Sequence, residues 1–361
     1  MATLAKTTLA PGARIRVLVV DDSVVIRRLV SLALGEDPLI EVVGSAANGL
    51  IALAKIPQVN PDVITLDVEM PELDGLATLR RLRVEHPQVR VILFSTLTRK
   101  GATATIEALL QGADDYVAKA ANVGQLSESL AALRGELVPK IKQFFVLADA
   151  PALPMPIVRP VAQVGQASFR PRILRKVVTI GVSTGGPTAL AEIMPAFPAG
   201  FPLPVVMVQH MPPMFTRLLA ERLQKQSALE VVEAAEGTVA KPGRVLIAPG
   251  DFHMRVRRNG DNVVAALDQG PHENSCRPAV DVLFRSVNET WGGAAIAVVL
   301  TGMGQDGLRG VEQLRASGAY VIAQDEPTSV VWGMPGAVAR ANLADAVVPL
   351  DGVVPEILRQ L

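Results

Sequence analysis

The first part of the chain alternates short apolar runs with stretches in which apolar residues recur at helical spacing. The runs are rich in Val, Ile and Leu, which is typical of strands buried on both faces of a sheet. Amphipathic stretches such as 24–34 and 76–84 lie between them and predict helices. Strands are expected at 15–20, 41–46, 63–66, 91–94 and 116–117. Because strands and helices alternate, we predict an α/β domain with a parallel, doubly wound sheet.

The alternation of strand and helix patterns resumes at residue 177. Segments 254–257 and 263–267 flank an Asn-Gly pair, which is the pattern of a β-hairpin. The other strands of this region are expected at 177–182, 205–208, 244–247, 294–300 and 320–323. We therefore predict a second α/β domain, Rossmann-like and mostly parallel, with a β-hairpin.

Residues 139–175 differ from both flanking regions. Six prolines, the first of them Pro139, are expected to break any long helix here. No acidic residue occurs from 150 to 191, whereas several arginines do. We interpret the segment as a partly extended basic linker, either a plain spacer or a docking segment for an acidic partner. The predicted domains are 1–138 and 176–361, joined by this linker.

The composition fits a globular protein with two domains. The chain has 361 residues, of which 49% are apolar but only 4% aromatic, so aliphatic residues must build the cores. Basic and acidic residues number 35 each, and the zero net charge argues against a nucleic-acid-binding protein. The single cysteine, Cys276, excludes an internal disulfide and suits a reducing compartment. Without an apolar run of about 20 residues or a signal-peptide pattern, we expect a cytoplasmic protein with no membrane insertion.

Polar residues follow four of the predicted strands of the first domain. Asp21 and Asp22 come after the first strand, Asp67 after the third, Ser95 after the fourth and Lys119 after the fifth. Since the carboxyl ends of parallel strands meet at one edge, these side chains are expected to gather there. Crowded carboxylates suit Mg²⁺, and a hydroxyl with an ammonium group suits a phosphoryl group. A single such aspartate could instead be a helix cap, but five placed residues weigh against that interpretation.

These residues belong to motifs that resemble the receiver domain of bacterial response regulators, which is flavodoxin-like. The motifs are Val-Val-Asp-Asp-Ser at 19–23 and Leu-Asp-Val-Glu-Met-Pro-x-x-Asp-Gly at 66–75. The resemblance implies that Asp67 accepts a phosphoryl group. It also implies that Asp21, Asp22 and Asp67 hold Mg²⁺, and that the switch residues are Ser95, Tyr116 and Lys119. One position departs from the family pattern: Ala120, not proline, follows the lysine, so the local geometry at Lys119 is expected to differ from that of the family.

The strand expected at 177–182 leads into Gly181-Val-Ser183-Thr-Gly185-Gly-Pro. Gly-x-Ser-x-Gly matches a nucleophile elbow, in which a strand-to-helix turn exposes a serine hydroxyl. Amides just after the serine, such as that of Thr184, can face a developing oxyanion. The alternative is a glycine-rich corner that binds phosphate or has no ligand.

A serine nucleophile needs a base and an orienting acid. Among the four histidines, His210 is the best candidate for the base because it follows the strand expected at 205–208. Asp306 follows the strand expected at 294–300, and Asp325 is a second candidate for the acid. The order Ser183, His210, Asp306 differs from the Ser–Asp–His order of α/β-hydrolases. His86, His253 and His272 are weaker candidates.

A rival pattern overlaps the candidate acid. Gly302-x-Gly304-x-x-Gly307 after a strand, with Asp325 about 20 residues on, matches a dinucleotide-binding fingerprint. However, the motif lies late in its domain and opens no first βαβ unit. A nucleotide-binding α/β protein therefore stays as a minor alternative.

Four segments in order resemble the chemotaxis protein-glutamate methylesterase family. They are Gly-Val-Ser-Thr-Gly-Gly-Pro at 181–187, Gln-His-Met-Pro-Pro-x-Phe-Thr at 209–216, Ser-Cys-Arg-Pro-Ala-Val-Asp at 275–281 and Thr-Gly-Met-Gly-Gln-Asp-Gly at 301–307. The resemblance implies Ser183 as nucleophile, His210 as base and Asp306 as orienting acid. Oxyanion donors are expected at Met303 and Thr184, Cys276 is expected to be a packing residue, and no cofactor is expected in the esterase site.

The resemblance to this family also implies a function. The expected reaction is hydrolysis of glutamate methyl esters on chemoreceptors, with glutamine deamidation as a second activity of the same acyl chemistry. The expected control is phosphorylation by a chemotaxis histidine kinase, with the unphosphorylated receiver packed over the hydrolase site. The alternative is a receiver-controlled interaction module whose esterase site is vestigial.

Overall fold

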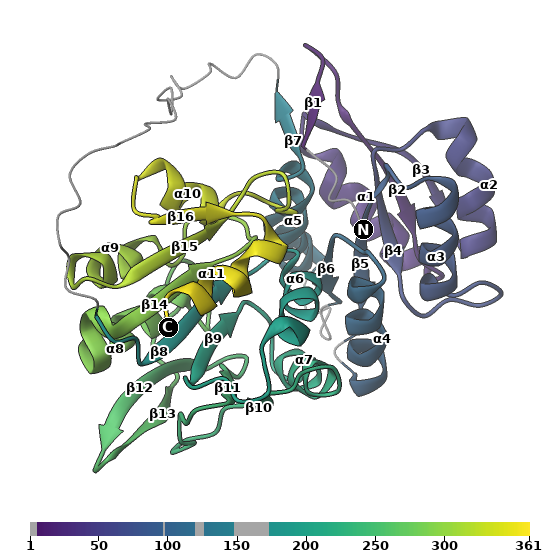
Figure 1. The fold of residues 1–361 in the computed structure, drawn as a ribbon. Helices are drawn as coiled ribbons and strands as arrows, with labels where there is room; N and C mark the ends of the chain where they lie inside the picture. Colours follow the sequence, from purple (N-terminus) through teal and green to yellow (C-terminus); the bar gives the residue numbers. More distant parts are fainter. Residues whose placement is uncertain (1–5, 97, 120–125, 148–172) are drawn as a thin grey trace.

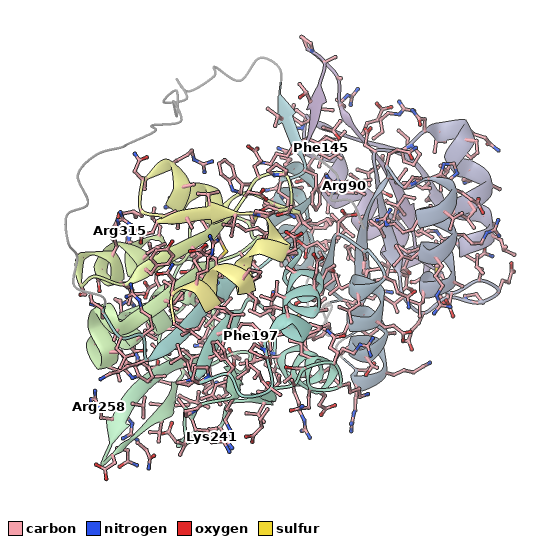
Figure 2. All side chains as sticks on the ribbon, viewed as in Figure 1. Arg90, Phe145, Phe197, Lys241, Arg258 and Arg315 are labelled. Carbon is pink, nitrogen blue, oxygen red and sulfur yellow. The ribbon has the colours of Figure 1, made fainter. Side chains whose placement is uncertain are left out.

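A computed structural model describes residues 6–96, 98–119, 126–147 and 173–361 (Figure 1). Two α/β units lie side by side, the first drawn in purple and blue and the second in green and yellow. Side chains fill the space between the sheets and their helices in both units (Figure 2). Within the described ranges, no helix has the length and apolar character to cross a membrane.

The N-terminal unit is built on a parallel five-stranded sheet in the order β3-β2-β4-β5-β6. Alternate residues of β2 enter different cores: Val17 and Val19 face one, Leu18 and Val20 the other. Both faces of the sheet are therefore buried, as the continuous apolar runs predict. The strands are β2 (Ile15–Val20), β3 (Ile40–Ala46), β4 (Val63–Asp67), β5 (Arg90–Ser95) and β6 (Asp115–Ala118). The helices are α1 (Val24–Gly35), α2 (Gly49–Val59), α3 (Gly75–Glu85), α4 (Arg99–Leu110) and α5 (Leu126–Lys142).

The expected helix break at Pro139 is wrong, because α5 continues through this residue to Lys142. The fully buried side chains of Leu137 and Ile141 hold this part of the helix against the core of the N-terminal unit. After α5, strand β7 (Phe145–Leu147) pairs in parallel with β1 (Thr7–Leu9), and neither strand was predicted. The first residues of the expected linker are thus folded onto the N-terminal unit. Positions 148–172 of that linker lie outside the described residues, as does Ala120.

The C-terminal unit is built on a parallel seven-stranded sheet in the order β10-β11-β9-β8-β14-β15-β16. Its strands are β8 (Val177–Val182), β9 (Val205–Gln209), β10 (Glu230–Glu233), β11 (Arg244–Ile247), β14 (Ala295–Val299), β15 (Tyr320–Gln324) and β16 (Ala346–Val348). The predicted hairpin is the separate antiparallel pair β12 (His253–Asn259) and β13 (Asn262–Asp268). The helices are α6 (Gly186–Ile193), α7 (Phe215–Gln224), α8 (Val280–Trp291), α9 (Leu308–Ala316), α10 (Met334–Arg340) and α11 (Val353–Arg359), and the 3-10 turns are η1 (Met194–Ala196), η2 (Gly292–Ala294) and η3 (Leu350–Gly352).

The two units meet where α4 and β6 pack against α6 and α7. The ring of Tyr116 stacks on that of Phe215, with centroids 5.0 Å apart. The hydroxyl of Thr188 donates a hydrogen bond to the carbonyl of Leu109 at 2.9 Å. One apolar core runs through this contact, since a single cluster includes side chains of both sheets. The contact brings the N-terminal unit against the loops that follow β8 and β9.

Candidate active site and acidic pocket

The candidate active site lies where the strand order of the C-terminal sheet reverses. The chain leaves β8 towards β9 and β11 on one side, and later continues through β14 and β15 on the other. Ligands of doubly wound sheets bind at such a reversal, outside the carboxyl ends of the strands. Ser183 follows β8, His210 follows β9 and Asp306 lies in the loop after β14. All three line one cleft of about 980 Å³.

The local sequence places Ser183 on a tight turn. Its backbone amide bonds the carbonyl of Thr301 at 3.0 Å, which ties the end of β8 to the end of β14. Gly185 has a φ of +78° at the start of α6, a conformation that L side chains rarely adopt. A side chain at Gly302 would put its Cβ 2.7 Å from that of Ser183. Gly185 therefore gives the turn the backbone freedom that the sequence predicts, and Gly302 leaves room for the serine.

His210 and Asp306 form a close pair. Nε2 of His210 lies 2.8 Å from Oδ2 of Asp306, and its Nδ1 lies 3.6 Å from Sγ of Cys276. Burial disfavours the imidazolium, but Asp306 and the Cys276 contact outweigh it and raise the pKa of His210. Within the described part of the chain, the hydroxyl of Ser183 makes no hydrogen bond. The structure thus joins the predicted base and acid directly, and brings the serine into the same cleft.

The carboxylate of Asp306 is held by several donors besides His210. Backbone amides of Val280, Asp281 and Gly307 bond it at 2.7, 3.0 and 2.9 Å. Burial would raise the pKa of Asp306, yet His210 and these amides lower it below its usual range. The acid therefore stays ionised in a buried position, as an orienting carboxylate must.

The two predicted oxyanion donors, Thr184 and Met303, have backbone amides that are available to bind a ligand. Among the described residues, the backbone amides of Thr184 and Met303 donate no hydrogen bond. Both residues line the cleft beside Ser183. Two unpaired amides next to a nucleophile can bind the oxygen of a tetrahedral intermediate.

The remaining candidates have other roles. His253 is buried, and its ring forms a hydrogen bond with the carbonyl of Pro271. His86 is the C-cap residue of α3. His272 lines the cleft but is exposed. Asp325 accepts hydrogen bonds from Thr328 within a turn.

Sequence reasoning missed Asp115, Asn274 and Asp281. Asp281 stands in one of the four family-like segments, but nothing in that pattern gave it a role. Asn274 and Asp306 are 32 residues apart, and their hydrogen bond of 2.7 Å depends on tertiary structure. Asp115 accepts a hydrogen bond from the hydroxyl of Thr184 at 3.0 Å, across the boundary between the two units.

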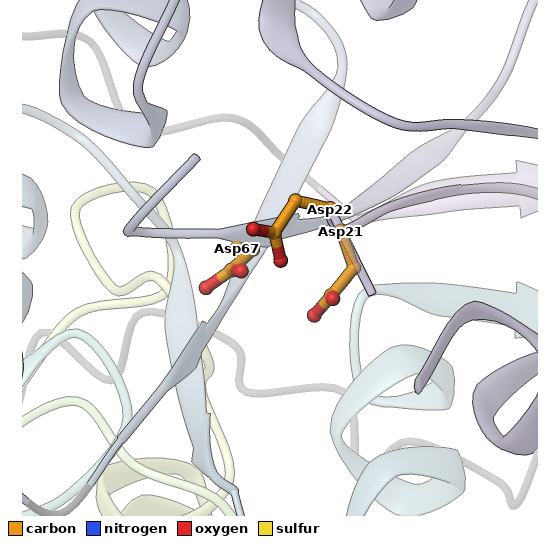
Figure 3. Close-up of side chains that lie close together, drawn as sticks. All are labelled: Asp21, Asp22 and Asp67. Atoms are coloured by element: carbon orange, nitrogen blue, oxygen red, sulfur yellow. The ribbon is translucent and has the colours of Figure 1, made fainter. Parts of the chain in front are cut away.

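The acidic pocket lies at the reversal of the other sheet, between β2 and β4. Asp21, Asp22 and Asp67 come together there as predicted, with ligand oxygens within 4.8 Å of one another (Figure 3). Nζ of Lys119 lies 2.8 Å from both Asp21 and Asp67. Burial raises the pKa of Asp67 to about 6, although Lys119 opposes this.

The other two predicted switch residues, Ser95 and Tyr116, have different partners. Ser95 is buried at the end of β5, and its hydroxyl donates to the carbonyl of Thr96 at 3.2 Å. Tyr116 is buried against Phe215 of the C-terminal unit, with the ammonium of Lys140 over its ring. Tyr116 thus forms part of the contact between the units.

Comparison with known proteins agrees with this arrangement. Residues 17–131 match the model of the response regulator receiver domain, and residues 178–357 match that of the CheB methylesterase. The protein-glutamate methylesterase/protein-glutamine glutaminase of Trichodesmium erythraeum is 50% identical over 96% of this chain and 99% of its own length. The protein of that name from Nocardioides is also 50% identical, over 97% of this chain and 96% of its own length.

A solved structure supports the same assignment. The crystal structure of the Thermotoga maritima CheB methylesterase catalytic domain shares 44% identity and a TM-score of 0.51. It covers 52% of this chain and 99% of the Thermotoga chain. The predicted fold class, two α/β domains, is confirmed. This chain therefore belongs to the family of chemotaxis protein-glutamate methylesterases/protein-glutamine glutaminases, with a receiver domain ahead of a CheB-type methylesterase domain.

Proposed function

We propose that this enzyme hydrolyses glutamate methyl esters on chemoreceptors through Ser183, His210 and Asp306, under control of phosphorylation at Asp67. The observation that carries the catalytic part is the 2.8 Å His210–Asp306 pair in one cleft with Ser183 and two unpaired amides. Glutamine deamidation proceeds through the same acyl-enzyme and is proposed as a second activity.

The chemical steps follow from which imidazole nitrogen is occupied. Asp306 holds Nε2, so Nδ1 is the atom that accepts the proton of the Ser183 hydroxyl. The serine oxygen attacks the ester carbonyl, and the amides of Thr184 and Met303 bind the oxyanion. The proton on Nδ1 passes to the leaving methanol, and the C–O bond to it breaks. Water then attacks the acyl-enzyme with His210 again as base, releasing the glutamate and restoring Ser183.

In this structure the acceptor nitrogen faces Cys276 rather than Ser183. This structure therefore lacks the nucleophile–base hydrogen bond that the reaction needs. This geometry supports low activity in the unphosphorylated enzyme.

The receiver contacts the residue next to the nucleophile. Asp115 precedes the switch aromatic Tyr116 and accepts a hydrogen bond from Thr184, which follows Ser183. Both side chains are buried, at 5% and 9% exposure. Helix α5 of the receiver also lines the cleft, through residues such as Glu136 and Lys140. Phosphorylation activates the esterase if it stabilises a form without these contacts more than the closed form.

The acidic pocket fits Mg²⁺. Hard oxygen donors from two neighbouring strands converge, and the raised pKa of Asp67 means that its charge lacks full compensation in the pocket. Asp21, Asp22 and Asp67 would hold the ion, which would neutralise charge on the phosphoryl oxygens when bound. The carboxylate of Asp67 attacks the phosphorus of a phosphohistidine, and the histidine of the chemotaxis kinase leaves. Lys119 is proposed to pair with the new phosphoryl group.

The test is methanol release from methylated chemoreceptor membranes, with and without a small-molecule phosphodonor and Mg²⁺. We expect release that rises with phosphodonor, is lost in Ser183→Ala and persists in Cys276→Ala. Loss of release in Cys276→Ala but not in Ser183→Ala would make Cys276 the nucleophile. Phosphorylation without any release would favour an interaction module with a vestigial esterase site.

A further inference from the structure

Helices α8 and α9 cap each other through two buried aspartates. Neither helix has a side-chain cap at its own N-cap residue, Ala279 or Gly307. Asp306, just before α9, accepts the amides of Val280 and Asp281 at the start of α8. Asp281, in the first turn of α8, accepts the amide of Gly310 in the first turn of α9 at 2.7 Å. The proposed catalytic acid is thus also a helix cap, held in a reciprocal arrangement.

Asn274 joins the two aspartates. Its Nδ2 donates to Oδ1 of Asp306 at 2.7 Å and to Oδ2 of Asp281 at 3.0 Å. An amide nitrogen carries two N–H donors, so one side chain can satisfy both carboxylates. Without these donors, two buried carboxylates would face each other with less compensation. The backbone of Asn274 has a φ of +52°, a conformation in which asparagine is tolerated.

The loop that carries Asn274 also reaches the base. The backbones of Glu273 and Cys276 exchange two hydrogen bonds. The guanidinium of Arg285 on α8 donates two hydrogen bonds of 2.6 Å to the carboxylate of Glu273. Cys276, at the end of the same turn, contacts Nδ1 of His210. Anchoring Asn274 to the aspartates therefore fixes both the acid and the loop against the base.

We propose that Asn274 is a positioning residue of the esterase, which fixes the ionised carboxylate of Asp306 towards His210 and holds the 273–276 loop at the cleft. The proposal rests on the proposed triad. It makes Asn274 act through Asp306, because its side chain makes no other hydrogen bond within the described residues.

The first variants change the Asn274 side chain. Asn274→Ala removes a donor to a charged group, so we expect kcat to fall about ten- to hundredfold with KM nearly unchanged. Asn274→Asp adds a third carboxylate beside Asp306 and Asp281, and we expect at least the same loss. The charged and titratable groups around His210 and its partner Asp306 are Cys276, Asp281, Glu273 and Arg285. The added charge favours the imidazolium, so the acid limb of the kcat/KM profile moves to higher pH.

A matched control tests whether an Asn→Asp substitution has the same effect outside the active site. Asn342 has a φ of +56° and lies exposed beyond the end of α10, away from the cleft. Asn342→Asp makes the same substitution in the same backbone region. We expect its kcat and pH profile to match those of the unaltered enzyme.

The decisive variant exchanges the two side chains, Asn274→Asp with Asp281→Asn. It restores an amide–carboxylate bond between positions 274 and 281 and leaves an acceptor for the amide of Gly310. It does not restore the donor to Asp306. A positioning role predicts that thermal stability recovers while kcat stays low. Recovery of kcat in the exchanged variant, or an unchanged kcat in Asn274→Asp, would overturn the proposal.

A second readout keeps this test independent of the proposed function. NMR of histidine-labelled full-length protein reports the titration of His210 whether or not esters are hydrolysed. We expect its midpoint to rise in Asn274→Asp and to stay in Asn342→Asp. If no Ser183-dependent release occurs in the unaltered protein, the proposed function fails, and an unmoved His210 midpoint in Asn274→Asp would still overturn the positioning role.

Discussion

Asp67 and Asp306 are matched in place and burial but opposite in electrostatics. Each lies at or after the carboxyl end of a strand beside the reversal of a doubly wound sheet, and each is 3% exposed. Burial raises the pKa of Asp67 to about 6. Burial acts in the same direction on Asp306, yet the pKa of Asp306 is lowered. Similar folds therefore place similar carboxylates at similar depths, and the fold alone does not decide their charge.

The donors around each carboxylate account for the difference. Asp306 accepts three backbone amides, the amide of Asn274 and His210. Asp67 has Lys119 and one amide, that of Glu69 at a long 3.3 Å, and it faces the charge of Asp21. A carboxylate with full compensation orients a base permanently. One with partial compensation binds a cation and accepts a phosphoryl group, which suits a switch.

The comparison assigns one nucleophile to each domain, Asp67 to the receiver and Ser183 to the esterase. The largest expected effect is that removing Ser183 stops one reaction and not the other. Ser183→Ala should lower esterase turnover by about 10⁴-fold or more, because loss of a triad serine removes the acyl-enzyme route. Phosphorylation of Asp67 by a small-molecule phosphodonor should continue at its usual rate. Methanol release and phosphoprotein formation, measured on the same sample, check both statements. A variant that loses both would show that the two sites are not separate.

The next effect tests the permanent charge of Asp306. Asp306→Asn keeps the shape but presents an amide to His210 and to the start of α8. We expect turnover to fall by about 10³- to 10⁴-fold, as for other triads whose acid is neutralised. Loss of the cap should also lower the melting temperature. Asp325→Asn, which changes an acid outside the cleft, is the control, and equal losses in both variants would contradict the assignment of the acid.

The third effect concerns the raised pKa of Asp67. The folded chain binds this proton more tightly than the unfolded chain, with a pKa of about 6 against an ordinary 3.8. The contribution of this group to the free energy of unfolding is therefore fully present below pH 4. It is lost as the pH rises through 6, which lowers the free energy of unfolding by up to about 3 kcal/mol. Without Mg²⁺, Asp67→Asn should be the more stable protein at pH 7.5 and lose that advantage near pH 4. Thermal unfolding at both pH values measures the difference.

Mg²⁺ sharpens the same prediction. The ion binds the ionised carboxylate, so its affinity should fall about tenfold per pH unit below pH 6. Added Mg²⁺ should also stabilise the unaltered protein at pH 7.5 but not Asp67→Asn. If Mg²⁺ stabilised both proteins equally, the acidic pocket would not be its site.

The sequence predicted the positions of both sites but not their electrostatics. Strand ends are visible in the apolar runs, and parallel sheets bring those ends together, so Ser183 and His210 could be placed in one cleft in advance. The reciprocal caps could not be predicted from the sequence. The partners of Asp306 lie on α8 and on a loop, and no local sequence pattern links either of them to Asp306. Strands β10 and β16 were missed for another reason. They are short edge strands, and Val347 of β16 is 48% exposed, so neither has a continuous buried run.

The helix through Pro139 shows how tertiary packing overrides a local signal. Pro139 predicts a break, yet neighbouring residues Leu137 and Ile141 are fully buried against the receiver core. Their burial outweighs the hydrogen bond that proline cannot donate. The structured receiver therefore extends beyond the boundary expected at residue 138.

The smallest expected effect tests whether the two carboxylate sites communicate. Thr188 is outside the proposed catalytic set, and its hydroxyl bonds the carbonyl of Leu109 across the domain contact. Thr188→Val keeps the shape but removes this hydrogen bond, which exists in the closed form only, while the carbonyl of Leu109 keeps the amide of Gly112. Loss of one such bond is worth about 0.5–1.5 kcal/mol, so activity without phosphodonor should rise about two- to tenfold. The phosphorylated activity should not change, because the open form lacks this contact. An equal change in both activities would place the effect within the esterase domain and break the proposed link between Asp67 and Ser183.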